Sequence, residues 1–182
     1  MRADYVWADN LGHVLAALTP ANRLACEVSL ATGLRIGDVL ELTREQVVKG
    51  RFSVREGKTG KVRRVRLPTD LQTRILSQAG HIYAFPARSD GRKHRTRQAV
   101  YKDLRRAAKA FRLSEHVSPH SLRKVYAVNQ YHRSGDIKRV QGLLNHSEES
   151  VTMIYALADA LTARRLGVPV DRVSGAGAEP QI

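Results

Sequence analysis

Pro119-His120-Ser121-Leu122-Arg123-Lys124 is the stretch on which the interpretation of this chain depends. Ser118 is expected to cap a helix beginning at Pro119, because a hydroxyl followed by a proline is a common helix start. His120 and Arg123 stand three residues apart, so a helix places both on one face. The amides and the positive dipole end of such a helix favour an anion. The stretch therefore predicts a helix start that presents an imidazole and a guanidinium to a phosphate.

Further candidate donors lie on either side of this helix. His146 precedes Tyr155 by nine residues, across a short polar break. Upstream, Arg35 follows Gly33, a residue well placed to end the helix predicted from Pro20 to about Thr32. A side chain just past a helix end can be aimed into a cleft. Together these residues predict cationic and imidazole donors around a phosphate, with a tyrosine hydroxyl nearby.

A change of period between residues 51 and 68 predicts a small β-sheet within an otherwise helical chain. Apolar residues alternate there on either side of Lys58-Thr59-Gly60-Lys61, a turn in which Gly60 permits a positive φ. Helical periodicity dominates elsewhere. The expected fold class is mainly α with a small antiparallel β-sheet. No internal repeat is evident.

The ordered set of six residues resembles the catalytic set of the tyrosine recombinases, also called the phage integrase family. That signature is an Arg in a Thr-Gly-Leu-Arg context, a Lys in a β-turn, a His-x-x-Arg, a further His, and a Tyr nine residues on. The residues that fill these places are Arg35, Lys58, His120, Arg123, His146 and Tyr155. The resemblance covers roughly residues 10 to 165. It implies an integrase-like catalytic domain that cleaves and rejoins DNA without metal or cofactor.

The resemblance also implies roles for individual residues. It implies a 3′-phosphotyrosine at Tyr155 and a proton from Lys58 to the leaving 5′-oxygen, with Lys61 as the alternative lysine. Asp38 is expected to orient Arg35 rather than to take part in the chemistry. Double-stranded DNA is the implied partner, bound as a homotetramer on two duplexes, with a monomer expected when the chain is free.

The residue types suit that chemistry. Ionising a tyrosine with a reference pKa near 10 at pH 7 costs roughly 4 kcal/mol, which nearby cations reduce. Each guanidinium can hold two phosphate oxygens, which a lysine cannot do. His120 and His146 are both candidates to accept the tyrosine proton, and the sequence leaves that choice open. His116 and His120 could chelate a cation, but no matching carboxylate or Cys cluster accompanies them.

The composition predicts a polyanionic partner. There are 31 Lys and Arg residues against 17 Asp and Glu, a formal net charge of +14, and nucleic acid is the usual partner of such a chain. Ribosomal-type and membrane-surface proteins are also basic. The membrane-surface class is disfavoured, because no apolar run approaches ~20 residues and no signal-peptide pattern opens the chain. The single cysteine, Cys26, is interpreted as core and fits a reducing cytoplasm.

A basic loop over residues 88–97, expected to be mobile, leads into a helix predicted over about residues 96–111. That helix should bury Val100, Leu104, Ala107 and Phe111 and expose its charged face. The uniform sign of the exposed charges favours contact with the DNA backbone over a merely solvated surface. The residues proposed for this contact are Arg92, Lys93, Arg95, Arg97, Lys102, Arg105 and Arg106.

Two departures from the family pattern bear on the interpretation. Asn145 stands where the family usually has Gly before the second His, a mild change because Asn tolerates the left-handed region. Family members generally carry an N-terminal core-binding domain, whereas this chain begins almost at the catalytic domain, which is expected over residues 1–166. We therefore expect either an isolated catalytic fragment or a short single-domain member without that N-terminal domain. Residues 167–182 are expected to form a flexible tail or to dock on a neighbouring protomer. The alternatives are a type IB topoisomerase-like enzyme and a non-catalytic DNA-binding protein with the same fold.

Overall fold

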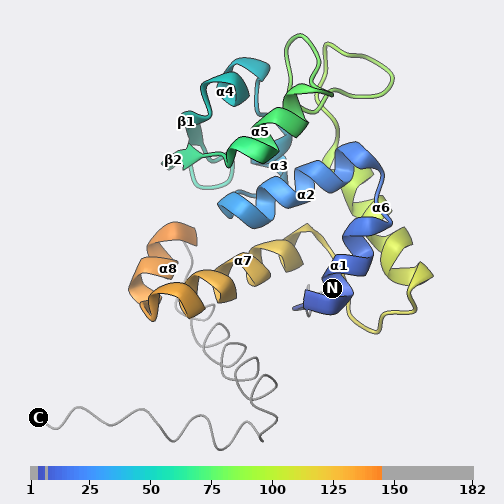
Figure 1. Cartoon of the computed structure of the whole chain (residues 1–182), viewed down its shortest axis with the longest axis vertical. Helices are drawn as coiled ribbons and strands as arrows, with labels where there is room; N and C mark the ends of the chain where they lie inside the picture. The colour runs from blue at the N-terminus through green and yellow to red at the C-terminus, as the bar shows by residue number, and fades with distance from the viewer. Residues whose placement is uncertain (1–3, 7, 145–182) are drawn as a thin grey trace, which may run out of the picture. The chain divides into compact units, whose positions relative to one another are not determined.

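The computed structural model describes residues 4–6 and 8–144 of the chain (Figure 1). The chain divides into two compact units, residues 1–126 and residues 127–182, which are described separately. In chain order, the elements are α1 (Ala8–Ala16), α2 (Pro20–Thr32), α3 (Ile36–Leu40), α4 (Arg44–Lys49), β1 (Arg51–Arg55), β2 (Val62–Arg66), α5 (Thr69–Leu76), α6 (Arg97–Ala110), α7 (Pro119–Ser134) and α8 (Ile137–Leu144). The predicted fold class, mainly helical with a small antiparallel sheet, is confirmed.

Helix α2 is central to the first unit and packs against α1, α3, α5 and α6 (Figure 1). It runs over the predicted residues because Pro20 fits the first helical position and Gly33 ends it in the left-handed conformation, with φ 69°. Cys26 is fully buried on this helix, as expected of a core residue. Burial of the Cys26 thiol raises its pKa, which makes a reactive thiolate unfavourable.

A buried carboxylate joins the start of α2 to α6. One oxygen of Asp103 accepts hydrogen bonds from the backbone amide and the hydroxyl of Thr19, at 2.9 Å each, and from Nδ2 of Asn22 at 2.8 Å. Its other oxygen accepts from Nη2 of Arg106 at 2.7 Å. These bonds satisfy free groups at a helix start and link α2 to α6.

The hairpin β1–β2 is the predicted sheet. The strands are antiparallel, with Phe52 opposite Val65 and Val54 opposite Arg63. Val54 and Val65 are buried, while the alternate residues of both strands face solvent. Gly60 adopts φ 67° in the connecting turn, as expected. The hairpin therefore packs one face on the core and presents its turn, with Lys58, beyond the strands.

Helix α6 confirms most of the expected pattern, with one correction nearby. Val100, Leu104 and Ala107 are fully buried. Phe111, expected to be buried, is 44% exposed; it follows the last residue of the helix and stacks on His13 with ring centroids 5.4 Å apart. The basic loop before α6 is held by a hydrogen bond from the amide of Ala87 to the carbonyl of Lys93, at 2.8 Å. This hydrogen bond joins the two sides of the loop, and the expected mobility of the loop stays a prediction.

The second unit begins within α7. This helix ends at Gly135, which adopts φ 63°, and Asp136 caps α8 by accepting a hydrogen bond from the amide of Arg139 at 3.0 Å. The end of α7 and the start of α8 both agree with the bounds predicted from the sequence. Val140 is buried.

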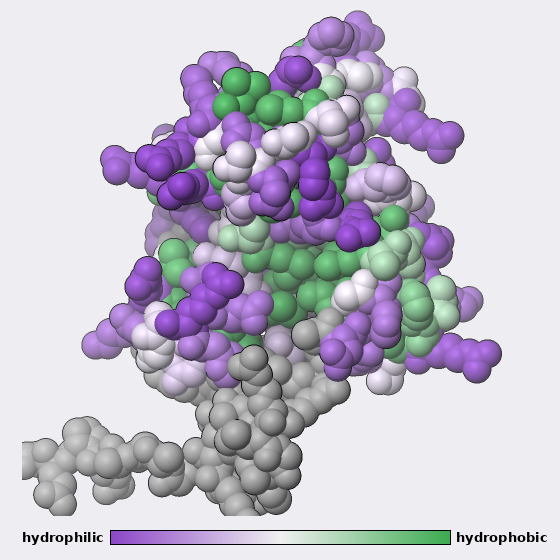
Figure 2. All heavy atoms as spheres, in the orientation of Figure 1, coloured by the Kyte–Doolittle hydropathy of each residue, from purple (hydrophilic) through white to green (hydrophobic). Residues whose placement is uncertain are grey.

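The hydrophilic residues expected from the composition lie on the surface. Figure 2 shows them over much of one face, with smaller groups of hydrophobic residues between them. Every helix among residues 4–6 and 8–144 is too short or too polar to span a bilayer.

Candidate active site

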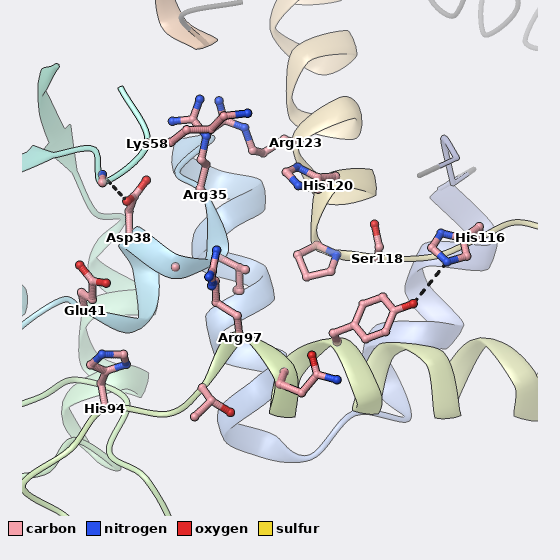
Figure 3. A pocket seen from close by; sticks show the side chains of 17 residues that line it. Arg35, Asp38, Glu41, Lys58, His94, Arg97, His116, Ser118, His120 and Arg123 are labelled. Atoms are coloured by element: carbon pink, nitrogen blue, oxygen red, sulfur yellow. Dashed lines mark hydrogen bonds between the residues drawn. The ribbon is translucent and has the colours of Figure 1, made fainter. Parts of the chain in front are cut away.

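An open cleft of about 1170 Å³ in the first unit brings five predicted site residues together (Figure 3). Its walls come from α3, the hairpin turn and the first turns of α6 and α7. The predicted residues that line it are Arg35, Asp38, Lys58, His120 and Arg123. In Figure 3 the side chains of Arg35, Lys58 and Arg123 gather at one end of the cleft, with His120 beside them. Segments far apart in the sequence thus supply a cationic pocket.

Arg35 occupies the position before α3 in an extended conformation, with φ −65° and ψ 146°. Its guanidinium donates a hydrogen bond to the carboxylate of Glu56. The Arg35 side chain keeps 17% of its surface exposed, whereas the Glu56 side chain is fully buried. The buried carboxylate therefore fixes Arg35 while part of the guanidinium still faces the cleft.

Arg123 is buried on α7, with only 4% of its surface exposed. It donates a hydrogen bond to the carbonyl of Gly33. Burial, followed by the positive charge of Arg35, lowers the pKa of Arg123 to about 10. A pKa of about 10 leaves this guanidinium protonated at neutral pH. Arg123 therefore brings a fixed positive charge into a poorly solvated position, where a phosphate would interact with it strongly.

The backbone carbonyls at the C-terminal end of α2 bind two arginine side chains. The carbonyl of Gly33 accepts from Arg123 and, at 3.5 Å, from Nη1 of Arg63, while the carbonyl of Thr32 accepts from Nη2 of Arg63 at 2.7 Å. The last carbonyls of a helix lack partners within it, and its C-terminus carries partial negative charge. The helix end therefore helps to hold both guanidinium groups.

His120 stands in the first turn of α7, at the cleft. Partial burial lowers its pKa, and the positive charges of Arg123, Lys58, Arg35 and Lys124 lower it further. The imidazole is therefore neutral at pH 7, with one nitrogen able to donate and the other able to accept a hydrogen bond. The hydroxyl of Ser118, expected to cap this helix, has no hydrogen-bond partner among the described residues. Instead, the Ser121 hydroxyl accepts from the Ser118 amide at 3.2 Å.

Asp38 has a different neighbour from the one expected. Its Oδ1 accepts a hydrogen bond from the backbone amide of Gly57 at 3.0 Å, next to Lys58 (Figure 3). The expectation that Asp38 orients Arg35 is not supported by the hydrogen bonds, because Glu56 is the carboxylate bound to Arg35. Asp38 comes one turn after Arg35 on a short helix that points its carboxylate at the hairpin. Asp38 thus holds the turn that carries Lys58, which is itself exposed.

Glu56 is the site residue that the sequence interpretation missed. It is buried, and it accepts hydrogen bonds from Arg35, from Nη1 of Arg63 at 3.4 Å and from the Thr59 hydroxyl at 3.0 Å. Burial raises the pKa of Glu56, but the hydrogen bonds from Arg35 and Thr59 and the charges of Arg35 and Arg123 outweigh burial and leave the pKa lowered. The signal in the sequence is that Glu56 is the only acidic residue between Arg51 and Arg66.

The predicted DNA-backbone residues differ in their surroundings. Arg97 lines the cleft, and Lys102 and Arg105 are exposed on α6. Arg92 and Lys93 pair with Asp90 at 3.2 and 3.9 Å. The guanidinium of Arg106 donates hydrogen bonds to Asp103 and to the carbonyl of Ala17. Arg106 therefore also stabilises the fold. Arg95 is half-buried. His146 and Tyr155 lie outside the described residues.

The cleft and its arrangement of cations agree with the result of comparing the sequence with family models. The model of the phage integrase family matches residues 8–161. The chain belongs to the phage integrase family. The predicted resemblance is thereby confirmed over most of the chain.

Curated members of the phage integrase family include both short and long relatives. Over 138 residues the chain is 35% identical to a probable integrase/recombinase, YoeC, of Bacillus subtilis, covering 73% of this chain and 75% of YoeC. Over 161 residues it is 30% identical to the tyrosine recombinase XerA of Pyrococcus furiosus, covering 84% of this chain and 54% of XerA. It covers 46% of the tyrosine recombinase XerD of Shewanella oneidensis. The chain thus spans about half the length of the Xer relatives it matches.

Solved structures of phage integrase family members show the same fold. The lambda integrase catalytic core aligns with a TM-score of 0.66 at 24% identity, over 81% of this chain and 93% of that structure. The XerA recombinase aligns with a TM-score of 0.65 at 23% identity, over 91% of this chain and 66% of that structure. The expected integrase-like fold is therefore confirmed.

Proposed function

We propose that this chain is the catalytic domain of a site-specific DNA recombinase that cleaves and rejoins strands through a 3′-phosphotyrosine. The observation that carries the proposal is the convergence of Arg35, Lys58, His120 and Arg123 at one cleft from segments far apart in the sequence (Figure 3). Family membership supports the same reaction, because curated relatives are named tyrosine recombinases. In this proposal residues 1–166 form the catalytic domain.

Arg35 and Arg123 bind the non-bridging oxygens of the scissile phosphate. A guanidinium forms paired hydrogen bonds to phosphate. Negative charge grows on the oxygens as the phosphorus becomes five-coordinate, so donors already in place stabilise the transition state more than the ground state. Glu56 and the carbonyl of Gly33 hold these two donors before DNA binds.

Tyr155 supplies the nucleophile in this proposal. The bond between its oxygen and phosphorus forms while the bond between phosphorus and the 5′-oxygen breaks. The tyrosine proton passes to a base, for which neutral His120 and His146 are the candidates, and the departing 5′-oxygen takes a proton from Lys58. Rejoining reverses each transfer, so the phosphodiester is restored without external energy.

The substrate and assembly follow from the same reasoning. Related structures include a lambda integrase dimer bound to a core site and a lambda integrase tetramer bound to a Holliday junction. We propose that this chain likewise binds double-stranded DNA in the cytoplasm and assembles on it as a tetramer, with residues 167–182 docking on a neighbouring protomer. The formal net charge of +14 supports binding to a polyanion.

Covalent trapping tests the proposal. The substrate is a duplex carrying the gene's flanking sequence, with a nick beside the cleavage position so that the leaving strand escapes. The wild-type chain should give a protein–DNA band that resists denaturation, and Tyr155→Phe should give none. Tyr101→Phe is the matched control, because Tyr101 lines the cleft but has no assigned step, and it should retain the band.

Each alternative function predicts a different result. A band that persists in Tyr155→Phe would assign the nucleophile to another residue. Binding without a band, at every flanking site tested, would favour the non-catalytic DNA-binding protein. A topoisomerase-like enzyme would also form the band, so exchange of labelled strands between two duplexes is the second measurement. Exchange supports the recombinase, and relaxation of supercoils without exchange supports the topoisomerase.

A further inference from the structure

We propose that Glu56 is a positioning residue that holds the Lys58 turn against Arg35, so that proton delivery to the leaving group depends on it. The inference rests on the proposed function and deepens it. Glu56 would touch neither DNA nor the reacting atoms; it would act through its neighbours.

The side chain of Glu56 joins two parts of the site that are separate in the sequence. One oxygen, Oε2, accepts from Arg35, 21 residues earlier, and from the hydroxyl of Thr59 at 3.0 Å. Thr59 directly follows Lys58. The other oxygen, Oε1, accepts from Arg63 of β2 at 3.4 Å. A single carboxylate therefore links the arginine before α3 to the turn that bears the lysine.

The backbone of Glu56 closes the same turn. Its amide donates to the carbonyl of Lys61 at 2.9 Å, and its carbonyl accepts from the amide of Gly60 at 2.8 Å. Asp38 adds the hydrogen bond to the amide of Gly57. Lys58 thus lies in a loop that is fixed on both sides, although its own side chain is exposed. The geometry of this loop determines where its ammonium group can reach.

The burial of Glu56 indicates that its negative charge has a role in holding the arginines around it. A fully buried carboxylate is unfavourable unless it is paired and hydrogen-bonded. Here it lies among Arg35, Arg63 and Arg123, whose like charges would otherwise repel one another in a poorly solvated region. Replacement by Gln keeps the size of the side chain but removes that charge and one acceptor. Arg35 and the turn would then lose their common anchor.

A purely structural ion pair is the simpler explanation, and substrate chemistry separates the two. When sulfur replaces the bridging 5′-oxygen of the scissile phosphate, the Tyr155–phosphorus bond forms and the phosphorus–sulfur bond breaks. The sulfur leaves as a thiolate, which needs no proton because the pKa of a thiol is about 8.5. A defect in proton delivery should disappear on this substrate, whereas general loss of folding should affect both substrates equally.

The experiment compares covalent-complex rates of wild type, Glu56→Gln and Lys58→Ala on the oxygen and sulfur substrates. On oxygen, Glu56→Gln should be about 100-fold slower than wild type, the effect expected from misplacing a reacting group by about an ångström. On sulfur it should recover to within about 10-fold of wild type, since only the effect on Arg35 remains. Glu56→Asp should be less impaired than Glu56→Gln, because it keeps the charge.

Two further variants control for folding. Glu27→Gln is matched to Glu56→Gln, because Glu27 also bridges two arginines, Arg23 at 2.8 Å and Arg74 at 2.7 Å, away from the cleft; its rate should equal wild type on both substrates. Thr59→Ala removes the bond from the turn to Glu56, together with a longer bond within the turn that the Thr59 hydroxyl accepts from the Lys61 amide at 3.4 Å. It should show a smaller loss, about 10-fold, again recovered on sulfur. If Glu56→Gln fails to fold, as read by thermal unfolding, Thr59→Ala decides the question.

Three results would overturn the inference while leaving the proposed function intact. They are a wild-type rate for Glu56→Gln on the oxygen substrate, an equal loss on both substrates by a folded Glu56→Gln, and no loss in Thr59→Ala where Glu56→Gln does not fold. A wild-type chain that forms no covalent complex on either substrate would instead contradict the proposed function itself.

Discussion

Gly33 shows how one residue position can determine both folding and chemistry. Its φ of 69° is unfavourable for other residues, and an added Cβ would lie 2.4 Å from the ring of Tyr126. Its carbonyl accepts from Arg123 and Arg63. We expect Gly33→Ala to lower the free energy of unfolding by about 2–4 kcal/mol, because strain and overpacking add. Urea denaturation measures this loss.

Gly12→Ala is the matched control, since Gly12 lies within α1 and an added Cβ there meets nothing within 4 Å. It should raise stability by about 0.5–1 kcal/mol. Combining Gly33→Ala with Tyr126→Leu should recover part of the loss, because the steric conflict is relieved while the backbone strain remains. A Gly33→Ala protein as stable as wild type would contradict this account.

The lowered pKa of His120 predicts that the stability of the folded chain depends on pH. Its pKa in the folded chain is lowered, so as pH falls through ~6.5 the unfolded chain binds a proton first. The free energy of unfolding should therefore fall with pH from ~6.5 down to the folded-state pKa, and His120→Gln should reduce that slope. Histidine NMR titration should place the midpoint below ~6.5 in the native chain.

Removing a neighbouring positive charge tests whether such charges lower the pKa of His120. Lys58 is one of the positive charges that lower the pKa of His120, so Lys58→Gln should raise the NMR midpoint. Inorganic phosphate in the cleft should raise it as well, because an anion favours the imidazolium. A midpoint above ~6.5 in the unliganded native chain, or one unmoved by Lys58→Gln, would contradict the electrostatic description.

At the scale of the element, α6 tests the predicted contact with DNA. Lys102 and Arg105 are exposed and form no ion pair with any residue of the described part of the chain. If each contacts a phosphate, Lys102→Gln and Arg105→Gln should each reduce the slope of log affinity against log salt by about 0.9. Fluorescence anisotropy with a short duplex over a salt series measures the slope.

Arg106→Gln is the comparison on the same helix. Because Asp103 and the Ala17 carbonyl bind its guanidinium, the change in slope should be much smaller than for Arg105→Gln. Equal changes for all three variants would mean that the helix acts through its total charge rather than through individual contacts.

The elements also show which features a sequence predicts well. The bounds of α2 and the end of α7 were predicted correctly because Pro20, Gly33 and Gly135 are local signals that act within one helical turn. Helix type and the buried stripe of α6 follow from periodicity. Phe111 was predicted wrongly, because its contact with His13 comes from another helix and lies beyond the last helical turn.

The sequence predicts which residues gather at the candidate site but not which of them bind one another. Motif and order predict Arg35, Lys58, His120 and Arg123, and all four line the cleft. Glu56 was missed because its partners lie before α3, in β2 and in the turn. No periodic pattern in the sequence indicates that these segments meet. The resemblance implies that Asp38 orients Arg35, but the hydrogen bonds do not support this, because the fold brings the amide of Gly57 to the Asp38 carboxylate.

At the scale of the whole molecule, the formal net charge of +14 predicts opposite effects of salt with and without DNA. Without DNA, like charges repel within the compact chain, so screening by salt should raise the melting temperature. With duplex at about 100 times its Kd in low salt, binding should add about 2.7 kcal/mol to the free energy of unfolding. A protein with 6–10 phosphate contacts loses about 10³–10⁵ in affinity between 50 and 200 mM salt, so nearly all of that gain should vanish.

Thermal unfolding with and without duplex across this range measures both trends, and the double variant Lys102→Gln/Arg105→Gln should show a weaker trend in each. If the unliganded chain instead melted at lower temperature as salt rose, attraction within networks such as Arg35–Glu56–Arg63 would outweigh the repulsion expressed by the net charge.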